Sequence, residues 1–217
     1  MNMPNDRLSR RRAAERGFTL IELLIVIAIL GVLAAVLLPR LLEAQESAEE
    51  TRTKATFLQL ETAIRHFEDA HGYFPPADLA DPEKKDVDWK PDNGINTCIE
   101  SLVCFVSQRQ KDGTDLSGLA DFFVNTDGDR HGAKMPLLGR SDRVELGDAW
   151  HTPLAYFTKH SMDKAQRMVQ FEGESEVQVK AKRRADGEYY GGGKWQLLSA
   201  GKDRTFGTDD DLVWPKN

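Results

Sequence analysis

A run of 21 residues near the amino terminus constrains this chain more than any other feature. Residues 18–38, FTLIELLIVIAILGVLAAVLL, contain 18 apolar side chains, and Glu22 is the one ionisable residue among them. At a rise of about 1.5 Å per residue, a helix of this length measures about 31 Å, enough to cross the hydrocarbon core of a bilayer. The run exceeds the roughly 7–15 apolar residues of a secretory signal, and no small-residue cleavage site follows it. It therefore predicts a membrane-spanning helix, with a buried core helix as the alternative.

Charge is distributed unevenly along the chain. The formal net charge is −6, but residues 1–17 hold five arginines against two acidic residues, so the remaining 200 residues stand at −9. Basic residues collect on the cytoplasmic side of membrane helices, so we expect residues 1–17 in the cytoplasm and everything after Pro39 outside. The acidic remainder argues against a nucleic-acid partner.

Glu22 is the residue that a simple membrane anchor does not require. A carboxylate in the hydrocarbon core costs at least about 2.5 kcal/mol on insertion scales, so a partner is expected. No cation stands in the surrounding apolar run. A cut before Phe18 would create a terminal amine, and Gly17-Phe18 is where the basic leader meets the apolar run.

The string RGFTLIE, from Arg16 to Glu22, followed by the apolar run and Pro39, resembles the class III signal of type IV pilins and type II secretion pseudopilins. The resemblance implies that a prepilin peptidase cuts after Gly17 and methylates the new amine of Phe18. It also implies that the Glu22 carboxylate meets the amine of a neighbouring subunit as a filament assembles, which pairs the buried charge.

The remainder of the sequence predicts an α+β fold in which a long amino-terminal helix packs on a small antiparallel sheet. Its helix is expected to continue over 39–72 with one buried face, formed by Phe57, Leu60, Ile64 and Phe67. Proline inside it predicts a kink or local melting at Pro39. The expected domains are a removed leader at 1–17, a membrane or filament-core helix at 18–38, its amphipathic continuation at 39–72 and a globular domain at 73–217.

Short elements are expected within the globular domain. Apolar spacing predicts a second helix over 95–106, with Ile95, Ile99, Leu102, Val103 and Val106 on one face. Residues 107–147 are loop-rich, with a short strand in ADFFVNTD. Four β-prone runs then follow, at 153–157, 167–171, 177–182 and 194–198. Cys98 and Cys104 fall on nearly opposite sides of the second helix, which predicts free buried thiols.

The C-terminal segment 199–212 is rich in carboxylates. Asp203, Asp209, Asp210 and Asp211 lie within nine residues, beside two glycines. Such a cluster suits Ca²⁺, which takes oxygen ligands at about 2.3–2.6 Å. A solvated acidic turn with aspartates bonded to backbone N–H groups is the alternative.

Residues 195–203 and 207–212 resemble the calcium loop of the major pseudopilin of type II secretion systems, and 147–153 resembles that family's turn before the sheet. The resemblance implies calcium ligation by Asp203, by two of the aspartates at 209–211 and by the carbonyl of Ala200. The sequence departs from the family at Arg204, where glycine is common, and at Ala149, His151 and Thr152, which replace Pro, Gly and Asn.

A second acidic segment, Asn125-Thr-Asp127-Gly-Asp129, opens like an EF-hand loop. It departs downstream, where Arg130 occupies the glycine position and Pro136 that of the bidentate glutamate, so we expect an Asx-rich turn. HExxH, GxSxG and helix-opening GxGxxG motifs do not occur, and an enzyme is not expected.

The resemblance implies a structural subunit. It would enter the bacterial inner membrane as a single-pass precursor, with its C-terminal domain in the periplasm. It would then form a homopolymeric pseudopilus of a type II secretion system, with an assembly platform and minor pseudopilins as partners and calcium as stabiliser. A surface type IV pilin for adhesion, motility or DNA uptake is the alternative; many such pilins close their C-terminal loop with a disulfide, whereas here no cysteine follows Cys104. A membrane-tethered enzyme lacks a catalytic motif.

Overall fold

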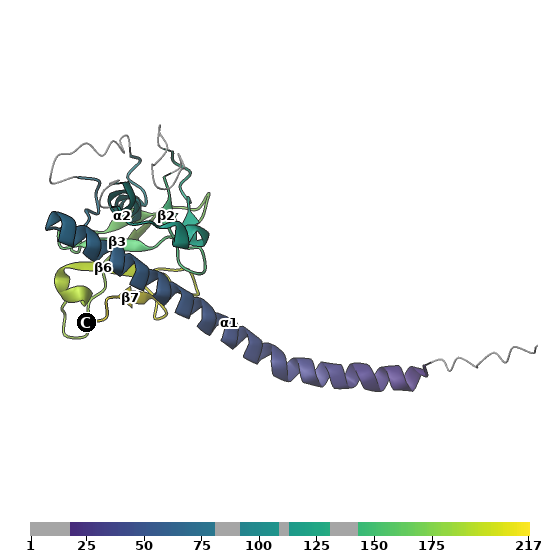
Figure 1. The fold of residues 1–217 in the computed structure, drawn as a ribbon. Helices are drawn as coiled ribbons and strands as arrows, with labels where there is room; N and C mark the ends of the chain where they lie inside the picture. The colour runs from purple at the N-terminus through teal and green to yellow at the C-terminus, as the bar shows by residue number, and fades with distance from the viewer. Residues whose placement is uncertain (1–17, 81–91, 109–112, 131–142) are drawn as a thin grey trace, which may run out of the picture. The chain divides into compact units, whose positions relative to one another are not determined.

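The computed structural model describes residues 18–80, 92–108, 113–130 and 143–217 (Figure 1). It comprises two compact units, Met1–Gln45 and Glu46–Asn217. Gly17 and the arginines before it lie outside the described residues. The predicted α+β, pilin-like arrangement is confirmed: a long apolar amino-terminal helix is followed by small antiparallel sheets.

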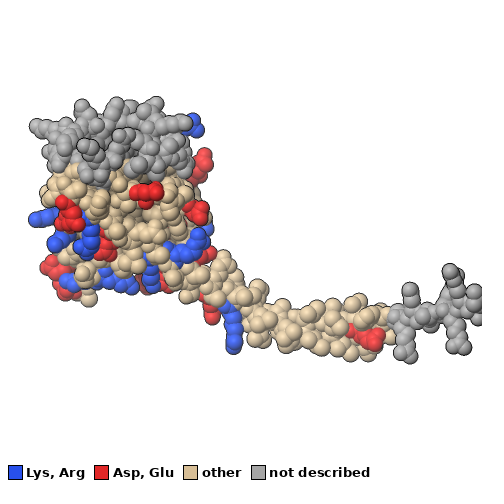
Figure 2. Space-filling view, viewed as in Figure 1, with Lys and Arg blue, Asp and Glu red and all other residues tan. Residues whose placement is uncertain are grey.

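Helix α1 (Leu20–His71) begins in the first unit, where its apolar side chains are exposed. Its most apolar 18-residue window has a mean hydropathy of 3.0 and none of it is buried; among the described residues, it is the one helix long and apolar enough to cross a membrane. Figure 2 shows this part as a surface with few charged side chains, whereas Lys, Arg, Asp and Glu gather over the second unit. These properties fit a membrane anchor. The backbone is helical through Pro39, so the predicted local melting is not found.

The part of α1 in the second unit buries one face. The predicted stripe is confirmed, since its four members are at most 3% exposed: Phe57, Leu60, Ile64 and Phe67. Phe67 meets Phe105 edge to face with ring centroids 6.0 Å apart, and Phe57 stacks on Trp214 at 6.4 Å. Aromatic pairs at such separations add about 0.5–1.5 kcal/mol beyond the burial of their area. This face therefore fixes the helix to the core of the second unit.

Helix α2 (Thr97–Gln108) confirms the predicted second helix, but it is central rather than one-sided. Ile99, Leu102 and Val103 are fully buried, and so are residues outside the predicted face, including Phe105. It packs against strands of all three sheets described below. Cys98 and Cys104 are buried thiols that are not joined in a disulfide, as predicted.

The strands of the described residues form three small antiparallel sheets rather than the single sheet expected. β1 (Phe123–Val124) pairs with β2 (Glu145–Leu146), and β4 (Gln166–Met168) pairs with β5 (Val177–Val179). The third sheet has the order β3 (Ala155–Thr158), β6 (Trp195–Ser199) and β7 (Leu212–Trp214), with 3-10 turns η1 (Ser117–Phe122) and η2 (Tyr190–Gly193) outside the sheets. The four β-prone runs overlap β3, β4, β5 and β6, and ADFFVNTD contains β1. The sequence patterns missed β2 and β7, which are two and three residues long.

Candidate functional site

The amino-terminal candidate site centres on Glu22 in the first turn of α1. The Oε2 atom of Glu22 accepts hydrogen bonds from the backbone N–H of Thr19 at 2.9 Å and from its hydroxyl at 2.7 Å. The Thr19 hydroxyl oxygen in turn accepts a bond from the backbone N–H of Glu22 at 3.2 Å. This is a capping box, in which the residue before the helix and the third helical residue satisfy each other's backbone donors.

The capping box changes the expectation for Glu22. The sequence predicts that its carboxylate needs an amine from outside its own helix, but Thr19 supplies two hydrogen bonds within the chain. The Thr-x-x-Glu spacing in the sequence is the signal that could have predicted it. Phe18, whose amine the resemblance implicates, is 82% exposed.

The C-terminal loop between β6 and β7 brings its aspartates onto backbone donors. Oδ2 of Asp210 accepts from the backbone N–H of Asp203 at 3.0 Å, and Asp203 Oδ1 accepts from that of Thr205 at 2.8 Å. Asp211 Oδ2 accepts from the N–H of Gly207 at 2.9 Å. Asp203 and Asp209 are exposed, whereas the neighbouring Ala200 is fully buried.

Gly201 lets the two sides of this loop approach closely. Its φ is +68°, and a Cβ atom there would collide with the carbonyl oxygen and the carboxylate of Asp210. Only glycine meets both demands, because other residues strain the left-handed region and carry a Cβ.

Lys182 is part of the loop site, although no sequence motif indicates it. Its ammonium group lies 2.7 Å from Asp211 Oδ2 and donates to the carbonyl oxygen of Thr208, also at 2.7 Å. The Asp211 side chain is fully buried, and its Oδ1 has no hydrogen-bond partner. Burial raises the pKa of Asp211, partly offset by Lys182. Burial acts in the same direction on Asp210, but bonds from Thr208 and Asp203 outweigh it and lower its pKa.

The loop fits calcium only in part. The orphaned Oδ1 of Asp211 is an available ligand, yet Lys182 already brings a positive charge to that carboxylate. Among the described residues, sets of three ligating side chains whose atoms lie within 4.8 Å of one another occur elsewhere and include none of the loop aspartates. The structure therefore places Asp203, Asp210 and Asp211 in one bonded loop without gathering them around one point.

The two positions at which the family commonly has glycine have glycine-like backbones here. His151 and Arg204 adopt φ angles of 62° and 58°, in the left-handed region that costs other residues about 1–2 kcal/mol. The turn at His151 is organised by Asp148, whose carboxylate accepts from the N–H of Thr152 at 3.0 Å and from the hydroxyl of Ser199 at 2.7 Å. This buried carboxylate thus connects the turn before β3 to the strand that enters the loop.

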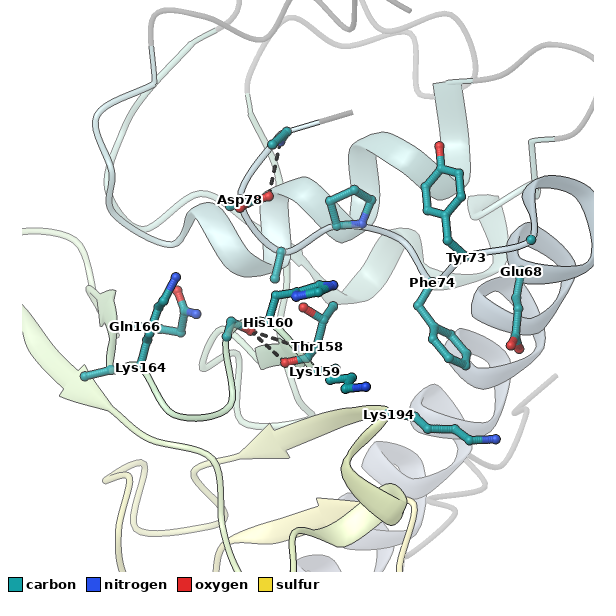
Figure 3. A pocket seen from close by; sticks show the side chains of 16 residues that line it. Glu68, Tyr73, Phe74, Asp78, Thr158, Lys159, His160, Lys164, Gln166 and Lys194 are labelled. Carbon is teal, nitrogen blue, oxygen red and sulfur yellow. Dashed lines mark hydrogen bonds between the residues drawn. The ribbon is translucent and has the colours of Figure 1, made fainter. Parts of the chain in front are cut away.

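A cavity of about 470 Å³ opens beside the C-terminal end of α1 (Figure 3). The ring of Phe74 and the side chains of Glu68, Lys159 and Lys194 contribute to its wall. Ser161 also lines the cavity. Its hydroxyl group accepts a hydrogen bond from the backbone N–H of Thr158 at 2.9 Å and donates one to the backbone carbonyl oxygen of Thr158 at 3.3 Å. The Ser161 hydroxyl is therefore held by the turn to which it belongs.

Comparison with known proteins identifies the amino-terminal segment. Residues 12–38 match the family model described as the prokaryotic N-terminal methylation motif. The type IV major pilin protein PilA of Myxococcus xanthus is 43% identical over 61 residues, 28% of this chain and 28% of that protein. Type II secretion system core protein G of Klebsiella michiganensis is 32% identical over 65 residues, which are 30% of this chain and 46% of that protein. Core protein G of Escherichia coli K12 is 38% identical over 60 residues, which are 27% of this chain and 41% of that protein.

These similarities cover less than half of each relative. Pilins and core protein G match the chain over comparable lengths, so the comparison gives a family-level similarity and does not choose between them. No solved structure matches the chain.

Proposed function

Because the chain carries the methylation motif and apolar helix of the type IV pilin and pseudopilin family, we propose that it is the major subunit of a pseudopilus in a type II secretion system. The single observation that carries a pilin-like role is the motif at residues 12–38, joined to a helix whose apolar side chains are not covered by any of the described residues. Lipid can cover these side chains in the precursor and copies of the helix can cover them in a filament.

The choice of secretion over a surface fibre rests on the C-terminal loop. It is closed by aspartates bonded to backbone N–H groups, and both cysteines lie in α2, far along the chain from it. The second candidate, a surface type IV pilin, is favoured by the 43% identity to PilA of Myxococcus xanthus. Deleting the gene in its own bacterium distinguishes them: a pseudopilin predicts loss of protein export with surface fibres retained, and a surface pilin predicts the reverse.

Processing forms the second part of the proposal. A prepilin peptidase would cut after Gly17 and methylate Phe18, and the globular unit would then lie in the periplasm. Replacing Gly17 with Val should leave a precursor that keeps its 17 leader residues and the positive charge of its arginines. Intact-mass spectrometry of the protein purified from membranes measures this, with Gly31→Val inside the helix as the matched control. A cut and methylated Gly17→Val protein would contradict the proposal.

Calcium binding at the C-terminal loop is the third part. The proposed ligands are Asp203, two of the aspartates at 209–211 and the carbonyl of Ala200, and the orphaned Asp211 Oδ1 supports a ligand there. If only the folded chain binds calcium, a calcium concentration of 100 times the Kd would stabilise the folded state by about 2.7 kcal/mol. We expect calcium to raise the Tm of the full chain in detergent micelles and Asp203→Asn to reduce the rise, whereas Asp186→Asn on an exposed turn should not. An unchanged rise in Asp203→Asn would exclude these ligands.

A further inference from the structure

A second group of carboxylates lies outside the C-terminal loop, where the first turn of α2 meets the β1–β2 pair. Its members are Asp92, Glu100, Asp127, Asp129 and Glu145. One oxygen atom from each of Asp92, Glu100 and Asp129 lies within 4.8 Å of the other two, and the same is true of Glu100, Asp127 and Glu145. Glu100 belongs to both sets and is therefore the centre of this acidic cluster.

No hydrogen bond compensates the negative charge of the Glu100 carboxylate. Its side chain is fully buried, and neither carboxylate oxygen has a hydrogen-bond partner. Oδ1 of Asp129 is also buried without a partner. Burying an unpaired carboxylate is costly, and buried polar atoms in folded proteins are almost always bonded. Three orphaned oxygens at one place indicate that a positively charged group belongs there.

Arg143 neutralises the outer edge of the acidic cluster. Its Nη1 atom donates to Asp92 Oδ1 at 3.0 Å and to Asp129 Oδ2 at 3.1 Å, and its side chain is 1% exposed. Even with these contacts, the Oδ1 atom of Asp129 and both carboxylate oxygens of Glu100 have no hydrogen-bond partner. One guanidinium also carries a single charge against five carboxylates.

Hydrogen bonds around the acidic cluster hold its carboxylates in place. Glu145 on β2 accepts from the side-chain amide of Asn96 at 2.8 Å and from the backbone N–H of Thr126 at 3.0 Å. The backbone carbonyl of Asn96 accepts from the N–H groups of Ile99 and Glu100 in the first turn of α2. These bonds fix the carboxylates of three chain segments relative to one another without occupying Glu100.

A proton is the competing occupant. Burial and the neighbouring carboxylates, Asp129 first, raise the pKa of Glu100, and burial raises the pKa of Asp129. A proton on Glu100 would remove its charge and could be shared with the Asp129 carboxylate, but it would pair at most two of the three orphaned oxygens. A cation, by contrast, satisfies all three orphaned oxygens together.

We propose that the acidic cluster binds one Ca²⁺, with both oxygens of Glu100 and Oδ1 of Asp129 as ligands and the other carboxylates completing the shell. Calcium oxygens lie at about 2.3–2.6 Å, so two ligands of one ion are separated by up to about 5 Å, which matches the spacing of 4.8 Å or less. Mg²⁺ needs near-ideal octahedral geometry and loses water reluctantly, so it fits a rigid, crowded carboxylate site less well. The side chains of Asp92 and Asp129, 17% and 14% exposed, give the ion access from solvent.

The bound ion would join the start of α2 to the turn after β1 and to β2. α2 is packed against strands of all three sheets, so an ion at its first turn would stabilise the second unit as a whole. This inference does not rest on the proposed filament function or on the calcium loop. Asp127 and Asp129 were expected to form only an Asx-rich turn, and Asp129 does donate its N–H to Asp127 Oδ1 at 3.3 Å.

The test uses the full chain in detergent micelles, with the C-terminal loop disabled by Asp203→Asn and Asp210→Asn. After chelation and dialysis, isothermal titration with CaCl₂ should give one site per chain. Adding Glu100→Gln, which keeps the size and removes the charge, should weaken that site roughly 100-fold or more. Glu176→Gln, at an exposed carboxylate paired with Arg167, is the matched control and should leave the affinity unchanged.

Three results would overturn the proposal. The first is the absence of binding at millimolar calcium in the loop-disabled chain, which would mean that protons occupy the cluster. The second is binding that survives Glu100→Gln, and the third is Mg²⁺ binding as tightly as Ca²⁺. Should Glu100→Gln fail to fold, Asp129→Asn takes its place and must also lose the site. The wild-type loop is titrated separately in the Glu100→Gln chain, so failure of the calcium loop and of the acidic cluster are distinguishable.

Discussion

Replacing Lys182 with Met tests which cation the C-terminal loop depends on. The ammonium group makes two contacts of 2.7 Å, and it faces a carboxylate, that of Asp211, whose side chain is fully buried. Removing one partner of a fully buried ion pair costs about 3–5 kcal/mol. Because the Lys182 side chain is 30% exposed, water screens part of the interaction. We therefore expect a loss of about 2–3 kcal/mol, or a Tm lower by roughly 5–10 °C for a unit of this size.

The assay is thermal unfolding of the full chain in micelles, first with a chelator and then with calcium. Lys180→Met is the matched control, because Lys180 is exposed on the same segment and should change stability by less than about 0.5 kcal/mol. If Asp211 is also a calcium ligand, calcium should restore more stability to Lys182→Met than to the control. A Lys182→Met chain as stable as Lys180→Met in chelator would refute the reasoning that Asp211 depends on the lysine.

Three further predictions concern other parts of the chain. Glu22→Gln should yield a processed, membrane-inserted protein with an intact helix start that fails to enter filaments, measured by shearing and sedimentation; normal filaments would contradict a role for the charge. His151→Gly should raise Tm by about 2–4 °C, because glycine relieves a left-handed φ worth about 1 kcal/mol; an unchanged or lower Tm would mean that the turn is not strained. Phe57→Ala should cost about 3–5 kcal/mol of unfolding free energy, whereas the adjacent, 52% exposed Leu58→Ala should cost little; equal losses would refute the assigned buried face.

Elements that depend on local pattern could be predicted from the sequence. The stripe of Phe57 to Phe67 repeats every three or four residues, and burial of that stripe requires only that a core exists. The strands β2 and β7 were not predicted, because they lack the longer β-prone run that surrounds the equally short β1, β4 and β5, and they pair with partners distant in sequence. α2 is apolar on more than one side for a similar reason: strands from all three sheets surround it.

The candidate sites also divide into features that a local sequence pattern shows and features that depend on residues distant in sequence. The motif around Glu22 is local, and so is the capping box with Thr19 that completes it. Lys182 reaches Asp211 across 29 positions of sequence, and Glu100 meets Glu145 across 45, so spacing within a motif cannot show either pair. The sequence of residues 125–129 shows only its departures from an EF-hand loop, whereas the carboxylates that lie beside this turn come from distant parts of the chain.

The capping box explains why assembly should depend on charge rather than on hydrogen bonding alone. In the isolated chain the Glu22 carboxylate already accepts two bonds from Thr19, so an intersubunit amine exchanges with or joins these bonds instead of filling a vacancy. Hydrogen bonds lost and gained nearly cancel, whereas the attraction between opposite charges grows steeply as the surroundings become less polar. Glutamine serves as well as glutamate at this position of a capping box. Glu22→Gln therefore keeps the monomer's helix start and removes only the interaction that strengthens inside a filament core, which makes the free energy of polymerisation the quantity that should change.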